Sequence, residues 1–179
     1  MFANGFGWSR ISDELEMCLT LYIGSDLALP ADSIDSPEPC VACVPTDRTP
    51  AVLSGKPNVS MIVEAANGAI YCSCAFQEAS LPWEQVEETS QTIAAFDRLR
   101  SVIASLCDQG DAPIVFACWT DCESDPPALE WRLAPESIRP GFSLFQASEL
   151  MPGGMPPDTY LLEFDQTMKT PQHKVAHVS

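Results

Sequence analysis

Cysteine is the residue type in this chain whose spacing points most directly to chemistry. Eight cysteines occur, at positions 18, 40, 43, 72, 74, 107, 118 and 122. Cys72 and Cys74 lie within an apolar stretch, residues 69–76, for which we expect a strand. Their thiols would project from the same face of that strand, about 6 to 7 Å apart along the chain. Two sulfurs so placed can bind one soft ion if a further ligand arrives from a neighbouring strand.

Two further cysteines fall where such a ligand could come from. Cys18 lies in the apolar stretch that opens the fold, and Cys118 lies at the end of another expected strand. The sequence therefore suggests a thiolate site for zinc or Cu(I) built from Cys72, Cys74 and Cys118, with Cys18 as a further candidate ligand. The alternative is that all four are buried as small apolar side chains, because free cysteine is among the most buried residue types.

The chain opening bears on whether these thiols are reduced. It lacks a basic segment followed by an apolar one, and no apolar run reaches the roughly 18 residues of a membrane span. We therefore expect a cytoplasmic protein, in which reduced thiols are more common than a disulfide framework. Cys40 and Cys43 have the spacing of a metal or redox pair, but they lack a second pair and a strand-to-helix turn. They could instead clasp the loop that contains them.

Few side chains in the sequence are suited to catalysis. A nucleophilic cysteine usually needs a nearby base, commonly histidine, and the two histidines, His173 and His177, both lie in the polar C-terminal segment. Acidic neighbours at Asp121 and Glu123 would raise a thiol pKa at Cys118 rather than lower it. Glycine patterns that bind phosphate are absent. Whether the chain is an enzyme is uncertain from the sequence, and a protein that is not an enzyme is favoured.

The acidic excess is the second functional signal. Nine Lys and Arg against twenty-five Asp and Glu give a formal net charge of −16. Nucleic acids and anionic membranes are disfavoured as partners, since both need a basic surface. Acidic residues gather in four segments, at 13–16, 32–38, 84–88 and 121–125. The alternative function is thus an acidic interaction module, of inhibitor or immunity type, that binds a basic protein without chemistry of its own. Plain solubility would explain the same charge.

The elements that must position these residues follow from apolar periodicity. Strand character occurs at residues 17–23, 59–64, 69–76, 113–119, 129–133, 142–146 and 159–164. Asn67 and Gly68 suit a hairpin turn. Ile93, Phe96, Leu99, Ile103 and Leu106 recur at helical spacing, and Gly110 supplies a stop. We therefore expect a single-domain α+β fold, with a largely antiparallel or mixed sheet packed by one long amphipathic helix.

Three regions frame that domain. Residues 1–16 are expected to form an N-terminal arm, 17–164 the α+β domain and 165–179 a polar C-terminal tail. The stretch 29–50 is rich in proline and aspartate and gives no usable period, so we expect a long loop. Either this loop is held across one face of the sheet, stiffened by proline rather than by a hydrogen-bond ladder, or it is a mobile polar loop.

Three blocks of the sequence carry a resemblance. Residues 17–30, Met-Cys-Leu-Thr-Leu-Tyr-Ile-Gly-Ser-Asp-Leu-Ala-Leu-Pro, open the matching part, and Cys-Ser-Cys-Ala-Phe at 72–76 and Cys-Trp-Thr-Asp at 118–121 follow. With these blocks the chain resembles an uncharacterised family of small bacterial proteins over roughly residues 17–150. Ala28 replaces a proline of that pattern, and Ser73 and Ala75 replace glycines. The resemblance implies a shared fold and no particular reaction.

Overall fold

The computed structural model describes residues 19–38, 40–70, 73, 76, 90–138, 159–168 and 172–175. In chain order the elements are β1 (Leu19–Ser25), β2 (Cys40–Pro45), the short 3-10 helix η2 (Ala51–Leu53), β3 (Asn58–Ala66), β4 (Ala69–Ile70), α2 (Ser90–Asp108), β5 (Ile114–Trp119), β6 (Leu129–Leu133), the 3-10 helix η3 (Pro135–Ser137), β7 (Thr159–Phe164) and β8 (Gln172–Val175). The arm at 1–16 and the strand expected at 142–146 lie outside the described residues.

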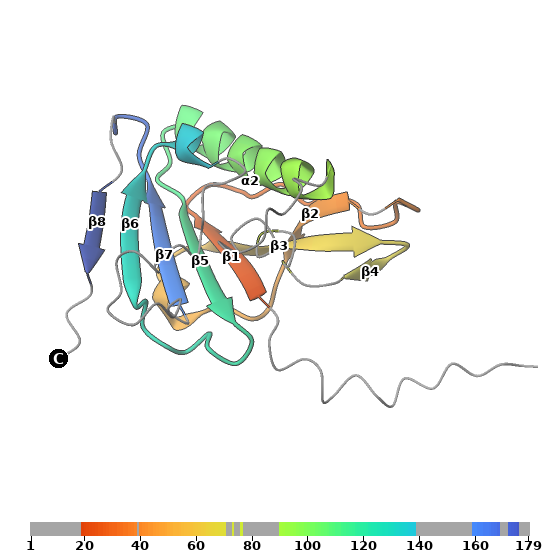
Figure 1. Ribbon diagram of the computed structural model, residues 1–179, viewed down its shortest axis with the longest axis horizontal. Helices are drawn as coiled ribbons and strands as arrows, with labels where there is room; N and C mark the ends of the chain where they lie inside the picture. Colours follow the sequence, from red (N-terminus) through yellow and green to blue (C-terminus); the bar gives the residue numbers. More distant parts are fainter. Residues whose placement is uncertain are drawn as a thin grey trace, which may run out of the picture.

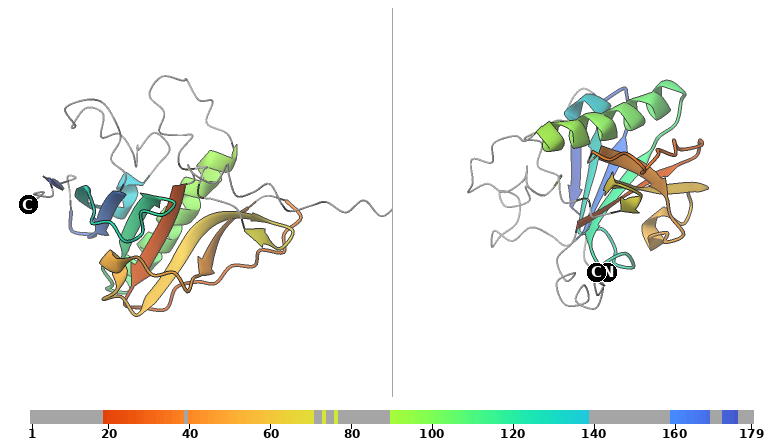
Figure 2. Two further views of the ribbon diagram at one scale, coloured as in Figure 1. Left: turned by 90° about the horizontal axis from the view of Figure 1, so that it is seen from below. Right: turned by 90° about the vertical axis from the view of Figure 1, so that its right-hand side faces the viewer.

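One mixed sheet organises the described part of the chain. Its strand order is β2-β3-β1-β5-β7-β6-β8, with β4 pairing with β3 beside this path. Every pair is antiparallel except β6 and β7, which are parallel. Helix α2 lies along one face of the sheet (Figures 1 and 2). The expected α+β class, with a mixed sheet packed by one long helix, is confirmed.

Helix α2 forms at the residues for which the apolar period predicted a helix. Phe96, Leu99, Ile103 and Leu106 are buried against the sheet, whereas Ile93 is 39% exposed and lies off the buried stripe. The helix ends because Gly110 adopts a positive φ of 87°, which a residue without Cβ does at low cost. Hydrogen bonds from Gly110 N to Cys107 O and from Asp111 N to Leu106 O then close the last turn.

Two apolar clusters lie on opposite faces of the sheet. The larger cluster packs under α2 and takes Leu19, Leu21 and Ile23 from β1. The smaller cluster contains Tyr22 and lies under η2; its buried members are Tyr22, Leu53, Phe116, Cys118 and Leu161. The nearly continuous apolar run of β1 therefore follows from burial on both faces, with alternate residues serving each cluster.

The expected long loop at 29–50 contains a strand. β2 pairs with β3 from Cys40 opposite Ala65 to Pro45 opposite Ser60. The expectation that proline, rather than a hydrogen-bond ladder, holds this stretch is therefore wrong for residues 40–45. Proline is tolerated here because β2 lies at the edge of the sheet and Pro45 is its last residue.

An aspartate covers the outer edge of β2. Asp32 N donates to Cys43 O at 3.0 Å, and Cys43 N donates to Asp32 Oδ2 at 2.8 Å. Arg98 of α2 holds the same carboxylate through its Nε and Nη2 at 3.0 and 2.5 Å. Because this hold depends on residues far apart in the sequence, local periodicity gave no sign of it.

The segment after β3 begins as expected and then departs from the expected strand. Asn67 and Gly68 have φ values of 51° and 77°, and they connect β3 to β4, so the hairpin is confirmed. The strand ends at Ile70, however, and Phe76 N donates to Ser73 O at 3.1 Å in a turn. A continuous strand over 69–76 is therefore wrong, because Phe76 turns into the core to pack edge-on against Phe96.

The C-terminal segment, expected from its polar composition to be a tail, contributes the strand β8. β8 pairs with β6, with His173 opposite Trp131. An edge strand leaves backbone N–H and C=O groups that a further strand can pair with whatever its side chains are. His173 therefore lies in a strand, and His177 lies outside the described residues.

Candidate functional site

The N-terminal end of β1 is anchored by a buried serine. Ser73 N donates to Leu19 O at 3.0 Å, and its Oγ accepts from Leu21 N at 3.0 Å and donates to Ile62 O at 2.5 Å. Antiparallel pairing of β1 with β3 stops at Leu21 and Ile62. The serine therefore fills the fork where the two strands separate and bonds backbone groups on both of them.

Cys118 lies on the other side of the same strand end. It is opposite Thr20 in the pairing of β5 with β1, and it is fully buried in the smaller cluster. Burial, with added effects from Glu123, Cys122 and Asp125, raises the pKa of the Cys118 thiol to about 12. The thiol is therefore protonated at neutral pH, and a metal could bind it only by displacing that proton.

The other three predicted ligands, Cys72, Cys74 and Cys18, lie outside the described residues. Their described neighbours in sequence are Ser73 and Leu19, which bond to each other. Ser73 bonds to β1 at Leu19 and Leu21, and Cys118 pairs with Thr20 from the other side of β1, so this one strand separates Ser73 from Cys118. Within the described ranges, no group of three or more His, Cys, Asp or Glu side chains could hold a metal ion.

Cys40 and Cys43 do not form the clasp that their spacing suggested. They are three residues apart on β2, so their side chains project from opposite faces of the sheet. Cys43 is buried under α2, and burial raises the pKa of its thiol. Cys40 is half-buried, and its Sγ donates to Ala65 O at 3.4 Å. Both are free thiols.

A tyrosine and a glutamate adjoin Cys118. Tyr22 OH donates to Glu123 Oε1 at 3.2 Å, and burial together with Glu123 raises the pKa of the Tyr22 phenol. The turn that carries Glu123 begins with a hydrogen bond from Cys122 N to Trp119 O at 3.0 Å. The surroundings of the Cys118 thiol are therefore apolar on the sheet side and acidic at the turn.

The C-terminal end of β1 is anchored by a different serine. Ser25 Oγ donates to Asp111 Oδ2 at 2.5 Å, and Asp26 N donates to the same oxygen at 3.2 Å. Ala112 N donates to Asp111 Oδ1 at 2.7 Å. Burial acts to raise the pKa of Asp111, but these hydrogen bonds and the nearby Lys56 charge outweigh it, and the pKa is lowered.

Lys56 extends this network across the strand end. Its Nζ lies 2.8 Å from Asp26 Oδ2 and donates to Ala112 O at 3.2 Å. The lysine stem packs over Gly24, where an added Cβ would lie 3.0 Å from Lys56 Cγ. The strand expected from the sequence ended at residue 23, and no role was predicted for Gly24, Ser25 or Asp26. The signal in the sequence that could have indicated this network is a glycine, a hydroxyl and a carboxylate in succession after an apolar strand.

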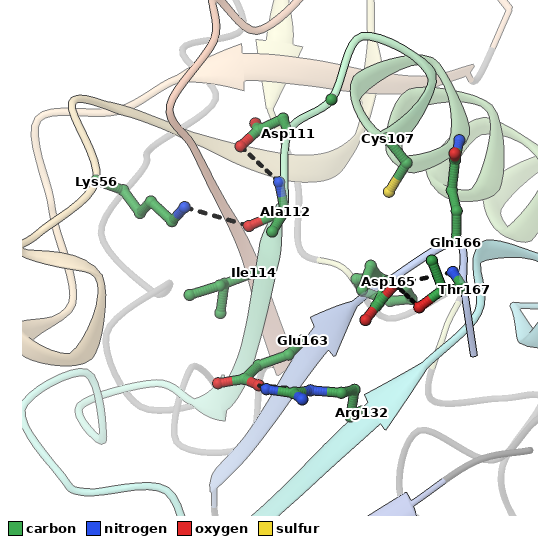
Figure 3. A pocket seen from close by; sticks show the side chains of 12 residues that line it. Lys56, Cys107, Asp111, Ala112, Ile114, Arg132, Glu163, Asp165, Gln166 and Thr167 are labelled. Carbon is green, nitrogen blue, oxygen red and sulfur yellow. Dashed lines mark hydrogen bonds and ion pairs between the residues drawn. The ribbon is translucent and has the colours of Figure 1, made fainter.

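A pocket of about 500 Å³ opens beside this network, at the C-terminal end of α2 (Figure 3). It lies where the loop from α2 to β5, the end of β7 and the exposed face of β6 meet. Its lining residues are Lys56, Cys107, Gly110, Asp111, Ala112, Ile114, Arg132, Glu163, Phe164, Asp165, Gln166 and Thr167. The cysteines predicted to bind metal do not line it.

Comparison with known proteins gives no further guide to function. Neither protein-family models, nor curated proteins, nor solved structures provide a match to this chain. None of the helices in the described ranges is long and apolar enough to cross a membrane. Function must therefore be argued from the side chains at these two strand ends.

Proposed function

We propose that the chain binds a soft metal ion such as zinc through thiolates of Cys118, Cys72, Cys74 and Cys18. One observation carries the proposal: Ser73 bonds to β1 at Leu19 and Leu21, while Cys118 pairs with Thr20 on the opposite side of that strand. Ser73, which lies between Cys72 and Cys74 in the sequence, therefore contacts Leu19, which follows Cys18. Both lie at the end of β1 with which Cys118 pairs.

The apolar surroundings suit a closed structural site better than an open catalytic one. Structural zinc sites are four-coordinate with cysteine and histidine ligands and have no open position. Cys118 is fully buried beside Phe116 and Leu161. Because its thiol pKa is raised, zinc binding at neutral pH must release a proton, and affinity must increase with pH.

Metal content of the untagged protein tests this proposal. We expect close to one equivalent of zinc in protein purified without chelator, and its loss in Cys118→Ala. Cys43→Ala is the matched control, because Cys43 is equally buried in a strand but lies on the opposite face of the sheet. Metal far below one equivalent in the wild-type protein, with the thiols titrating freely in the native state, would contradict the proposal.

We also propose, as a second function, docking of the acidic surface on a basic protein. Four ion pairs engage Lys56, Arg98, Arg100 and Arg132 with carboxylates of the same chain. By contrast, in the described part of the chain no ion pair involves Asp121 or Asp125, and both are exposed. This acidic turn therefore keeps its charge available to a partner.

Association kinetics test the second function. A basic partner captured at low salt should associate more slowly with an Asp121→Lys, Asp125→Lys variant, while its dissociation rate changes little. Asp47→Lys is the single-site control, since Asp47 is exposed and outside the turn. If Asp47→Lys slows association by half as much as the double variant does, the effect comes from net charge and not from the turn. Capture of no basic partner would exclude the function.

A further inference from the structure

The pocket at the end of α2 combines an apolar floor with a charged rim. Phe164 contributes apolar surface to the lining. Ile114 and Cys107 do so as well, with charged side chains around them (Figure 3). A space of about 500 Å³ falls within the range of small-molecule sites, which are mostly apolar with a few polar groups that fix orientation.

The two cations of the rim are already engaged by carboxylates. Lys56 Nζ lies 2.8 Å from Asp26 Oδ2, which is outside the pocket, and Arg132 Nη2 lies 3.0 Å from Glu163 Oε2. Because each positive charge is paired with a carboxylate of the same chain, its attraction for an anionic ligand is weakened. The pocket is therefore poorly suited to a carboxylate or phosphate.

One carboxylate of the rim, that of Asp165, is less fully compensated. Asp165 Oδ1 accepts from Thr167 N at 2.8 Å and from Thr167 Oγ1 at 2.7 Å, and in the described residues no hydrogen bond reaches its other oxygen. These bonds, with help from Arg132, lower the pKa of Asp165, so it is ionised at neutral pH. Asp111 is ionised as well, and the partial negative charge at the C-terminal end of α2 adds to both.

Cys107 supplies an independent observation. It is only 5% exposed, and its sulfur is directed toward the pocket (Figure 3). No hydrogen bond to this thiol occurs in the described ranges, so a buried, weakly polar group faces the cavity without a partner. Burial, together with Asp111, Asp108, Asp165 and Glu136, raises the pKa of Cys107 to about 11. Negative charge therefore converges on the pocket from several elements.

We propose that this pocket binds an organic cation, an ammonium or guanidinium group carried on a short apolar stem. The stem would lie on Ile114 and Phe164, and the cationic head would lie between Asp111 and Asp165. This site is separate from the thiolate site, and its failure would leave the metal proposal unaffected. The same chemistry could come from a free alkylamine or from a lysine side chain of a basic protein.

Amide-resolved NMR titration of the full chain tests the proposal with two probes, n-butylammonium and lysine blocked at both backbone ends. We expect saturable shifts at residues 107–114 and 163–167 with at least one probe. Stronger binding of n-butylammonium would indicate a free amine, and stronger binding of blocked lysine would indicate a protein side chain. Butyrate and n-butanol have similar stems without the cation, and we expect neither to saturate the same amides.

Two variants locate the head group. Asp165→Asn should weaken binding about threefold to fivefold, the range expected for one partly exposed charge pair. Gln166→Lys, which adds a cation at an exposed rim position, should weaken binding by a similar factor. Asp47→Asn, an exposed acid outside the pocket, should change nothing. Absence of saturable shifts, equal binding of butyrate, or unchanged binding in both rim variants would overturn the proposal.

Discussion

The two ends of β1 are each anchored by a buried serine, and the anchors differ in what they bond. At the N-terminal end, the hydrogen bonds from Ser73 to β1 and β3 within the described residues all involve backbone groups, those of Leu19, Leu21 and Ile62. At the C-terminal end, Ser25 bonds to the ionised carboxylate of Asp111 beside a solvent-facing pocket. We call these the neutral end and the charged end, after the groups that the two serines bond.

This difference separates two kinds of chemistry along one strand. Burial raises the pKa of a thiol at the neutral end, at Cys118, and so keeps it protonated until a metal displaces the proton. Hydrogen bonds lower the pKa of a carboxyl at the charged end, at Asp111, and so keep it ionised. Stability should consequently respond to alkali through the first end and to acid through the second.

Replacing the two serines should give the largest contrast. Ser73→Ala leaves the Leu21 N–H and the Ile62 C=O buried without their partner, and should lower the free energy of unfolding by about 2 to 4 kcal/mol. Ser25→Ala should cost about 0.5 to 1.5 kcal/mol, because water can reach Asp111. Urea denaturation at pH 7 measures both, and an equal or reversed order would remove the distinction between the ends.

Gly24→Ala should perturb the charged end by less than Ser73→Ala perturbs the neutral end. The new Cβ would press on Lys56 Cγ at 3.0 Å and on Leu53 Cδ2 at 3.2 Å. We expect a loss of about 1 to 2 kcal/mol in the free energy of unfolding, as for mild overpacking. Combining Gly24→Ala with Lys56→Ala, which clears the nearest atoms, should reduce the loss; a double variant with additive losses would contradict the steric cause.

The loss of stability in acid should come in part from Asp111. Its pKa is lowered in the folded state, so its contribution is present above the ordinary aspartate pKa of about 3.9 and is lost as pH falls through the lowered value. Asp111→Asn should therefore be less stable than wild type at pH 7, with a difference that shrinks toward pH 3. Cys118→Ala should leave this acid dependence unchanged, and a constant difference for Asp111→Asn would contradict the assignment.

The alkaline limb should belong in part to Cys118 and should be the smallest of these effects near neutral pH. Its folded pKa is raised to about 12, so its contribution is complete below the ordinary thiol pKa and is lost as pH rises above it. Metal-free Cys118→Ala should lose stability less steeply than wild type between about pH 8.5 and pH 11. Asp111→Asn should follow the wild-type slope, and identical slopes for all three proteins would refute the role of Cys118.

Local pattern predicted the elements whose burial is regular. The stripe through Phe96, Leu99 and Ile103 predicted α2, and the two-sided apolar run of β1 predicted its strand. β2 was not predicted because its stability depends on contacts between distant residues. Asp32 covers its outer edge, and Arg98 of α2 holds Asp32 in place. Such a pairing follows from the assembled fold and has no local period.

The candidate sites were less predictable than the elements. Cys118 was expected at a strand end and lies there, but its apolar surroundings come from residues spread along the whole chain. The bond between Ser25 and Asp111 spans 86 positions in the sequence. The pocket beside it joins α2, β5, β6 and β7, so its lining could not be assembled without the topology.

The X-ray absorption spectrum of the zinc-loaded protein, measured at the zinc edge, tests the central claim most directly. If thiolates at the N-terminal end of β1 bind the ion, the spectrum will show sulfur ligands at about 2.3 Å, the usual zinc–sulfur distance. Cys118→Ala will lose sulfur from that shell, while Cys43→Ala will keep the wild-type spectrum. A shell of oxygen and nitrogen at about 2.0 to 2.2 Å, unchanged in Cys118→Ala, would contradict the claim.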